Sequence, residues 1–294
     1  MTQFVENLMN RASKLNKTIA LAEGTDVRAA KAAEILTKKG VCKVVLIGNE
    51  DEIKAKFPEI DFTGVSFDDP KTSDHRADYA NTLFELRKAK GMTEEQALNI
   101  VTTNNMFYAC VALKRGDVDG VVGGAVFSSA DVSRAAFQVI KAAPGISSVS
   151  SCFVMVPPED FKYKKYPAYI FSDCAVIPYP TSDQLSDIVG AAADSAKKIC
   201  EMEPKIAMLS FSTKGSAKHE AIDKVRAAYE KVKAEHPEIK VDGELQLDAS
   251  LVDSVAAQKA PGSEVAGQAN VLVFPNLDAG NIGYKIAQRF GNCL

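Results

Sequence analysis

Short runs of apolar residues alternate with longer stretches of mixed character along the chain. In the first half, compact apolar runs end at glycine in KTIALAEG (17–24), CKVVLIG (42–48) and DGVVGG (119–124). Runs of this length that end at glycine are typical of buried β-strands. The stretches between them repeat apolar residues at helical spacing. Strands that alternate with helices in this way predict a parallel sheet.

The stretches between these strands also carry the start and stop signals of helices. In 26–40, alanine and leucine recur at helical spacing, and Gly40 follows two lysines of the last turn. The segment 92–116 is helical in the same way, and Thr93 with Gln96 forms the pattern of a capping box. The first half therefore predicts one layered α/β structure.

The second half repeats this order after a change in composition. Proline and glycine within 144–148 break the chain between a helix and a strand. We therefore predict two α/β domains, 1–146 and 147–294. The predicted strands of the second domain are 147–156, 166–173, 205–213 and 270–276, and its amphipathic helices are 182–201 and 215–237.

Composition limits the function classes. The chain has 294 residues, 46% of them apolar, 25% charged, and a net charge of −3. This is the composition of a globular protein long enough for two cores. No basic surplus favours nucleic acid as a partner. No apolar run approaches the ~20 residues that span a bilayer, and the N-terminal segment lacks the apolar region of a signal peptide. We therefore expect a cytoplasmic protein with no membrane partner.

Cysteine and histidine do not form a recognisable chemical site. The six cysteines include no C-x-x-C pair and have no histidine at zinc-ligand spacing. The three histidines, His75, His219 and His236, lie in polar stretches. We interpret the cysteines as reduced core or strand residues and expect no metal site.

The stretch GGAVFSSADVSR (123–134) passes from glycines through a hydroxyl-rich turn into a helix. Unpaired amides at such a helix start favour an anion, and Ser128 and Ser129 add hydroxyl groups. Arg134 would supply a fork suited to phosphate oxygens. A capped helix with Arg134 as a surface charge explains the same residues. The stretch is neither a G-x-G-x-x-G fingerprint nor a P-loop.

Three later segments also carry polar groups at the ends of predicted elements. SFSTKGSAKHE (210–220) places Ser212 and Lys214 where a strand ends, although a capped helix after a turn is an equal explanation. DGELQLDASL (242–251) alternates carboxylates with leucines, which suits acid/base chemistry but is more typical of a half-solvated strand. FPNLDAGNIGYKIAQRF (274–290) brings Asn281 and Tyr284 into one helix entry, with capping as the simpler interpretation.

Several of these segments together resemble the phosphate acetyl/butyryltransferase family. The resemblance runs through eight blocks in the family's order: LAEGTDVRAAKAA, LFELRKAKGMT, KRGDVDGVVGGA, SSADVSRAAFQVIKAAPG, SDCAVIPYPTSDQL, KIAMLSFSTKGSA, DGELQLDAS and PNLDAGNIGYKIAQR. Eight ordered blocks are more specific than any single motif. They imply two Rossmann-like three-layer α/β/α domains, similar to isocitrate and isopropylmalate dehydrogenases, with the active site in a cleft between them.

The resemblance also implies an activity and its partners. The expected reaction is acetyl-CoA + phosphate ⇌ acetyl phosphate + CoA, by direct attack in a ternary complex with an aspartate as base. Coenzyme A is then a substrate, no cofactor is needed, and the protein is a homodimer. An arginine and amide cleft would bind acetyl phosphate and stabilise the departing phosphate without a metal.

Some residues correspond to family positions. Arg134, with Ser128 and Ser129, resembles the family's phosphate or acetyl phosphate site, and Arg87 resembles an arginine implicated in CoA binding. Ser212, Lys214, Asn281 and Tyr284 are further candidates for the cleft.

The sequence also departs from the family pattern. Relatives continue beyond the block that ends in QR through a further strand and a PVNDLSRG-like motif, whereas this sequence reads RFGNCL. We therefore expect the family's catalytic serine, arginine and aspartate to lie outside these residues, and assign no catalytic residue. Ile177 and Tyr179 also stand where the family commonly has asparagines.

Three alternatives to an active acetyltransferase stay open. The first is a phosphate butyryltransferase, because one or two methylenes leave little trace in a sequence. The second is an inactive remnant that binds phosphate or CoA. The third, an NAD-dependent decarboxylating dehydrogenase, is disfavoured because the dinucleotide motif is missing.

Overall fold

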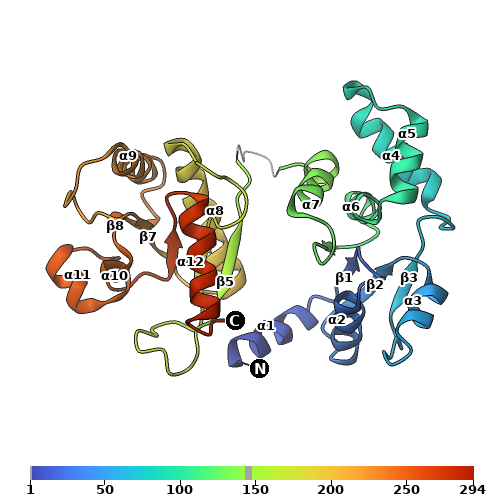
Figure 1. Ribbon diagram of the computed structural model, residues 1–294, viewed down its shortest axis with the longest axis horizontal. Helices are drawn as coiled ribbons and strands as arrows, with labels where there is room; N and C mark the ends of the chain where they lie inside the picture. The colour runs from blue at the N-terminus through green and yellow to red at the C-terminus, as the bar shows by residue number, and fades with distance from the viewer. Residues whose placement is uncertain (1, 143–147) are drawn as a thin grey trace. The chain divides into compact units, whose positions relative to one another are not determined.

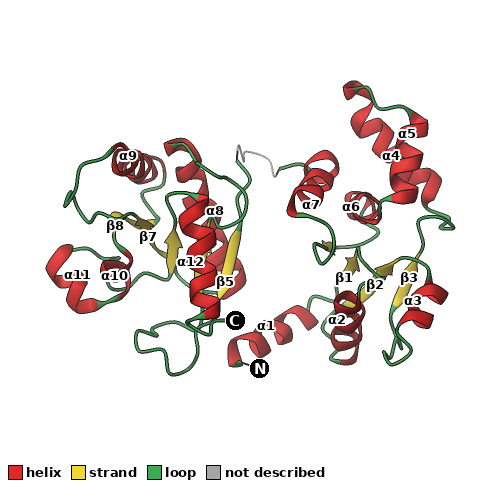
Figure 2. Ribbon diagram, in the orientation of Figure 1, coloured by secondary structure: helices red, strands yellow, loops and turns green. Residues whose placement is uncertain are grey.

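The computed structural model describes residues 2–142 and 148–294. The chain divides into two compact units, Met1–Ala142 and Ala143–Leu294, and each has its own β-sheet (Figure 1). Both units mix strands with helices on their faces (Figure 2). The predicted α/β class is confirmed.

Unit 1 is built on a parallel sheet of four strands. The sheet order is β3-β2-β1-β4, and each described pair is parallel. Its strands are β1 (Thr18–Leu21), β2 (Lys43–Ile47), β3 (Ser66–Asp68) and β4 (Gly120–Val122). Parallel strands need crossover connections, and helices supply them here. The carboxyl ends of the four strands therefore meet at one edge.

Helices cover both faces of this sheet. On one face, α2 (Val27–Lys38) and α3 (Glu50–Lys56) share a core with Val44 and Leu46 of β2. On the other face, α4 (Arg76–Arg87), α5 (Glu94–Thr103), α6 (Asn105–Arg115) and α7 (Ser129–Ala135) pack around Ala20 and Ala22. The remaining elements are α1 (Gln3–Ser13), the 3-10 helix η1 (Lys88–Lys90) and the π-helix η2 (Ala136–Ile140).

Unit 2 has a mixed sheet in the order β5-β6-β9-β7-β8. Its strands are β5 (Cys152–Met155), β6 (Tyr169–Ser172), β7 (Lys205–Leu209), β8 (Lys240–Leu245) and β9 (Val271–Val273). The four strands from β6 to β8 run parallel, whereas β5 pairs antiparallel with β6. The sequence pattern predicted only parallel pairing, because a strand's direction leaves no mark on its own hydrophobic run.

Helices flank this sheet as well. On one face, α10 (Leu247–Leu251), α11 (Asp253–Lys259) and α12 (Leu277–Arg289) join Ala207 and Leu272 in a shared core. The alternate strand residues Ile206 and Met208 are fully buried too, so the opposite face is also covered. There α8 (Ser182–Cys200) and α9 (Glu220–Glu235) contact the strands and each other.

Two helix predictions need correction. The segment 92–116 is not one helix, because Asn104 ends α5 and its side chain accepts hydrogen bonds from the amides of Met106 and Phe107 to start α6. The predicted capping box at Thr93 is present. The segment 215–237 becomes helical only at α9, since the residues before it form a loop.

The alternating segment 242–251 is not a half-solvated strand. Strand β8 is buried at every position after its first residue and ends at Leu245, and α10 begins two residues later. The apparent alternation of carboxylates with leucines therefore crosses the boundary between a buried strand and a helix. In the described part of the chain, no helix is long and apolar enough to cross a membrane.

Candidate functional site at the carboxyl ends of the strands

Polar loops leave both sheets at the carboxyl ends of their parallel strands, where α/β proteins usually bind ligands. Three of these loops share one device: a buried carboxylate accepts several hydrogen bonds from backbone amides or side chains of the loop. The three carboxylates are Glu23 in unit 1 and Asp173 and Glu244 in unit 2. The sequence interpretation did not assign this role to any of them. Their one visible signal is an acidic residue at or just after the end of an apolar strand.

Glu23 holds the turn that follows β4. Its Oε2 accepts hydrogen bonds from the amides of Gly124 and Ala125 at 2.9 and 2.8 Å. Its Oε1 accepts from the amides of Val126 and Phe127 at 2.5 and 2.6 Å. Burial would raise the pKa of Glu23, but the four amide donors outweigh it and the pKa lies below its usual value. The chain's own carboxylate therefore occupies the amides of this turn.

The predicted phosphate residues follow directly on α7. Ser128 is the N-cap, and its Oγ accepts a hydrogen bond from the amide of Asp131 at 3.2 Å. Ser129 is the first residue of the helix. Arg134 Nη1 lies 3.0 Å from Asp131 Oδ1, and 58% of the arginine side chain is exposed. Capping therefore explains Ser128, while Arg134 keeps an accessible guanidinium on the same short helix.

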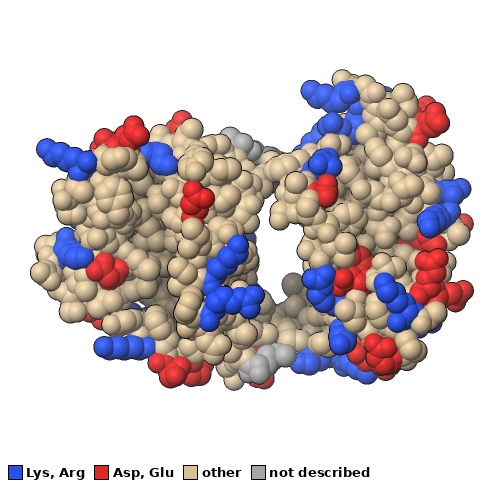
Figure 3. Space-filling view, in the orientation of Figure 1, with Lys and Arg blue, Asp and Glu red and all other residues tan. Residues whose placement is uncertain are grey.

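A second arginine contacts the turn, and the sequence interpretation missed it. Arg28, at the start of α2, donates from Nη2 to the carbonyl of Ala125 at 2.5 Å. It also makes a two-bonded ion pair with Asp26, the N-cap of α2, at 2.8 and 2.9 Å. Hydrogen bonds from Arg28 lower the pKa of Asp26 to about 2. Lys and Arg are interspersed with Asp and Glu on the visible face of this unit (Figure 3), so any preference for an anion is local.

Arg87, the predicted CoA residue, ends α4. Its Nε is buried without a hydrogen-bond partner. Among the described residues, the hydroxyl of Thr37 is the other buried side-chain group that lacks a partner. A buried donor without an acceptor is unfavourable. Within residues 2–142, the structure shows no hydrogen bond or ion pair between Arg87 and the turn that carries Ser128 and Arg134. These candidates are therefore not brought into direct contact.

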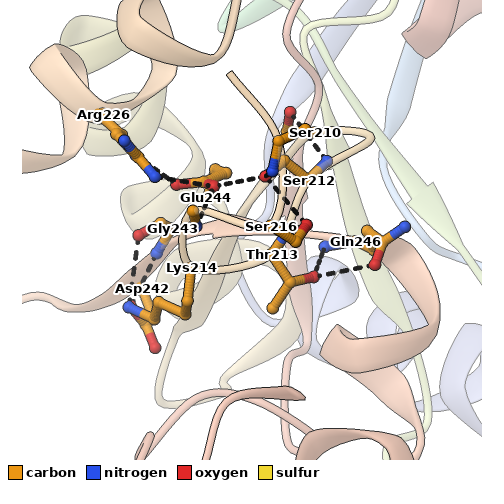
Figure 4. A network of polar contacts seen from close by, with 12 residues as sticks. Ser210, Ser212, Thr213, Lys214, Ser216, Arg226, Asp242, Gly243, Glu244 and Gln246 are labelled. Carbon is orange, nitrogen blue, oxygen red and sulfur yellow. Dashed lines mark hydrogen bonds and ion pairs between the residues drawn. The ribbon is translucent and has the colours of Figure 1, made fainter. Parts of the chain in front are cut away.

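In unit 2, a polar network holds the loop after β7 (Figure 4). Ser212 is fully buried, and its Oγ donates to Glu244 Oε1 at 2.8 Å. The amide of Gly215 donates to the same oxygen at 2.8 Å, and Arg226 Nε donates to Oε2 at 2.8 Å. The hydroxyl of Ser212 therefore holds its own loop together and does not face solvent.

Glu244 is an ionised structural group. It is 1% exposed, and burial alone would raise its pKa. The hydrogen bonds from Arg226, Gly215 and Ser212 outweigh burial and lower the pKa to about 2. A carboxylate with so low a pKa and no exposed face is a weak general base. The acid/base interpretation of this segment is therefore not supported by the geometry.

Lys214 lies beside this network with a positive φ of 48°. Its ammonium group pairs with the buried carboxylate of Asp242 and lies 5.3 Å from the centre of the Tyr229 ring. The side chain is 38% exposed. Together with Lys233, Lys240 and Lys259 it lines a polar cavity of about 710 Å³. Lys214 thus has an internal partner, while part of its side chain stays accessible.

Asn281 contacts the third loop, which Asp173 holds. Asp173 is 3% exposed and accepts from the amides of Ala175 and Ile177 at 3.0 and 2.7 Å. Asn281, on α12, donates from Nδ2 to the carbonyl of Cys174 at 3.1 Å. Helix α12 therefore packs directly on this loop.

Tyr284 and Tyr179 have partners of other kinds. The ring of Tyr284 stacks on Phe153 with centres 4.3 Å apart, so Tyr284 packs on β5 rather than on the loop. Tyr179, at a position where the family commonly has asparagine, donates from its hydroxyl to Asp278 at 3.0 Å. This tyrosine therefore does supply a polar contact from its loop.

One further cavity is apolar. A cavity of about 340 Å³ beside α12 is lined without any charged side chain, by residues such as Met155, Phe171 and Ile286. No cluster of three or more His, Cys, Asp or Glu in the described chain could hold a metal ion.

The fold and these loops define a two-unit, three-layer α/β protein with polar loops at the carboxyl ends of its strands. Solved structures of the same arrangement include a phosphotransacetylase from Streptococcus pyogenes, 38% identical, with a TM-score of 0.90, covering 100% of this chain and 88% of that chain. Another is the EutD phosphotransacetylase from Staphylococcus aureus, 38% identical, with a TM-score of 0.87, covering 99% and 87%.

The sequence comparisons agree with these structures. Residues 3–294 match the family described as Phosphate acetyl/butaryl transferase, and the chain belongs to this family. A phosphate acetyltransferase of Clostridium acetobutylicum is 49% identical over 288 residues, and one of Acetivibrio thermocellus is 48% identical over 286 residues. Each alignment covers 97% of this chain and 86% of the relative. The resemblance stated from the sequence is confirmed, and a dehydrogenase is not favoured.

Proposed function

We propose that this chain catalyses reversible acetyl transfer between coenzyme A and inorganic phosphate. One observation carries the proposal: relatives that are 48% and 49% identical over 97% of the chain are phosphate acetyltransferases. Identity of this extent covers both units and all the loops described above. The substrates are acetyl-CoA or CoA with phosphate or acetyl phosphate, and coenzyme A takes part as a substrate rather than as a bound cofactor.

The phosphate end of the substrate binds at the turn before α7. Arg134 offers an accessible guanidinium there, and Ser128 and Ser129 add hydroxyl groups at the helix start. An arginine fork stabilises both the bound acyl phosphate and the phosphate that departs. Arg134 pairs with Asp131, so phosphate binding would exchange one anionic partner of the arginine for another.

The other substrate approaches as a thiolate. The CoA sulfur attacks the carbonyl carbon of acetyl phosphate, a C–S bond forms, the C–O bond to phosphate breaks, and phosphate leaves with the electron pair. A free thiol has a pKa of about 8.5, so the attack needs a base or a positive field near the sulfur. Arg87, a half-buried arginine at the end of α4, contributes to CoA binding. We assign the base to no residue of this sequence.

The proposal also covers the protein's location, its oligomeric state and its preferred acyl group. The protein acts in the cytoplasm as a homodimer, like the family it resembles. Acetyl is the preferred acyl group, because both of the relatives named above are acetyltransferases. A pocket separates acetyl from butyryl by only about 1–3 kcal/mol for one or two methylenes. The preference between acetyl and butyryl groups must therefore be tested by comparing rates with the two substrates.

The test measures acetyl-CoA formation from acetyl phosphate and CoA by the purified chain, with butyryl-CoA compared in the reverse direction. We expect turnover with acetyl substrates and a lower kcat/KM with butyryl substrates. Calorimetry with CoA and with acetyl phosphate runs in parallel. Binding of both without turnover would identify an inactive remnant and reject the proposal. Turnover that favours butyryl groups would reject the acetyl preference.

A further inference from the structure

We infer that Glu23 is a positioning residue for the anionic substrate, because its carboxylate fixes the turn that presents Ser128 and Arg134. The inference rests on the proposed function of that turn. Glu23 lies outside the residues that would touch the substrate, and acts through the backbone between them.

The geometry of the turn is that of an anion-binding nest. Four consecutive amides, from Gly124 to Phe127, point at one carboxylate, with N···O distances between 2.5 and 2.9 Å. Gly124 has a φ of 108°, a conformation that side chains disfavour, and it lets the chain curl around the acceptor. Without Glu23, four amides in this turn would lose their acceptor.

The fixed turn leads directly into the substrate residues. The last amide held by Glu23 belongs to Phe127, and the next residue, Ser128, is the N-cap of α7. Phe127 also packs against the core of unit 1. The direction in which α7 starts, and so the place of Arg134, therefore follows from the bonds that Glu23 makes.

A second contact holds the same turn. Arg28 donates to the carbonyl of Ala125, whose amide Glu23 accepts. Because both the amide and the carbonyl of Ala125 are hydrogen-bonded, this part of the turn can neither rotate nor shift freely. Glu23 follows β1 by two residues and Arg28 lies at the start of α2, so both contacts tie the turn to elements that pack in the core of unit 1.

A competing role for Glu23 predicts the opposite effect on phosphate binding. If substrate phosphate had to displace Glu23 from the four amides, removing the carboxylate would tighten phosphate binding. Glu23 is 6% exposed and both of its carboxylate oxygens already accept amide hydrogen bonds, which favours the positioning role. Two anions in one nest would also repel each other.

The experiment compares the full chain with Glu23→Gln and Glu23→Asp. Glutamine keeps the shape but turns one acceptor into a donor that faces amides, and aspartate keeps the charge with a shorter reach. Glu34→Gln is the matched control, since Glu34 lies in the same unit and pairs with Lys38 on α2. KM for acetyl phosphate and for CoA, kcat, and hydrogen exchange at amides 124–127 are measured.

For Glu23→Gln we expect amides 124–127 to exchange at least about 10-fold faster, since the amides lose hydrogen bonds to an ionised acceptor. KM for acetyl phosphate rises about 10-fold or more, KM for CoA stays within about 2-fold, and Glu23→Asp gives a smaller rise. The control changes neither quantity. If Glu23→Gln does not fold, the Glu23→Asp values decide by the same criteria.

Two results would overturn the inference: a lower KM for acetyl phosphate in Glu23→Gln, or an unchanged KM for acetyl phosphate, whether or not the turn exchanges faster. An inactive wild-type chain that binds no substrate would instead reject the proposed function. Hydrogen exchange needs no activity, so it still shows whether Glu23 fixes the turn. The two failures are therefore distinguishable.

Discussion

Arg226 and Glu244 form a two-bonded ion pair in unit 2. Arg226 Nε donates to Oε2 at 2.8 Å, and Nη2 donates to Oε1 at 3.3 Å (Figure 4). The two ends differ in environment, because Glu244 is 1% exposed while 41% of the Arg226 side chain is exposed. Since the same carboxylate also accepts hydrogen bonds from Ser212 and Gly215, the ion pair and the loop after β7 belong to one hydrogen-bond network.

Replacing Arg226 by methionine should destabilise the protein more than removing an exposed ion pair does, because the buried carboxylate of Glu244 loses its counter-charge. Urea unfolding of wild type and Arg226→Met gives the difference. Lys198→Met is the control: its partner Asp194 and Lys198 itself are both more than half exposed, so the loss should stay below about 1 kcal/mol. Equal losses in the two variants would contradict the role given to Arg226.

The low pKa of Glu244 makes stability depend on pH. Its pKa is about 2 in the folded chain, against an ordinary value of 4.5, so its contribution is complete above pH 4.5. The contribution is lost as pH falls from about 4.5 to 2, by up to about 3 kcal/mol. The free energy of unfolding of wild type minus that of Glu244→Gln should therefore be constant from pH 5 to 7 and shrink below pH 5. Parallel pH curves for the two proteins would refute this.

Much of this fold could be predicted from the sequence. Glycine-bounded apolar runs identified β1, β2 and β4, and caps such as Thr93 marked helix starts within a residue or two. The short edge strand β3 was missed, because three residues, one exposed and two half-buried, give too little periodicity. A single capping asparagine, Asn104, divided a helix that looked continuous.

The functional loops were harder to predict than the elements. Ser128 and Arg134 could be found because glycines, hydroxyls and an arginine share one stretch of sequence. Glu23 could not, since it lies more than a hundred positions from the amides that it binds. Glu244 was read as a solvated strand residue because its partner Arg226 lies on a different element. Long-range pairing of charges is what a single sequence leaves out.

Arg134 should tolerate lysine poorly. Lysine keeps the charge but loses the fork that suits phosphate oxygens. We expect Arg134→Lys to raise KM for acetyl phosphate about 10-fold and Arg134→Ala to raise it further, with stability within about 0.5 kcal/mol of wild type, because the pair with Asp131 is exposed. Steady-state kinetics measure this. Arg76→Lys, an exposed arginine on α4, is the control and should leave KM unchanged.

Replacing Arg87 by methionine should weaken CoA binding without lowering the stability of the protein. Its Nε is buried without an acceptor, so Arg87→Met removes an unsatisfied donor. The free energy of unfolding should stay equal or rise by up to about 1 kcal/mol. Calorimetry should show CoA binding weakened at least about 10-fold, while acetyl phosphate binding is unchanged. An unchanged affinity for CoA in Arg87→Met would contradict the role given to Arg87.

Gly280 marks the closest approach of α12 to the loop held by Asp173. A Cβ at this position would lie 2.3 Å from the carbonyl oxygen of Asp173, a backbone atom that cannot move alone. Gly280→Ala should therefore cost at least about 2 kcal/mol and shift the loop. Gly190, in α8, is the matched control because a Cβ there meets nothing within 4 Å.

The two alanine substitutions should therefore change the stability of the protein in opposite directions. Gly190→Ala should stabilise the chain by roughly 0.5–1 kcal/mol, since alanine favours the helix over glycine. Thermal and urea unfolding measure both variants. Because Asn281 also binds this loop, through the carbonyl of Cys174, kcat/KM should fall in Gly280→Ala if the loop takes part in the reaction, and stay unchanged in Gly190→Ala. If Gly280→Ala were as stable as wild type, the close packing of α12 on this loop would be wrong.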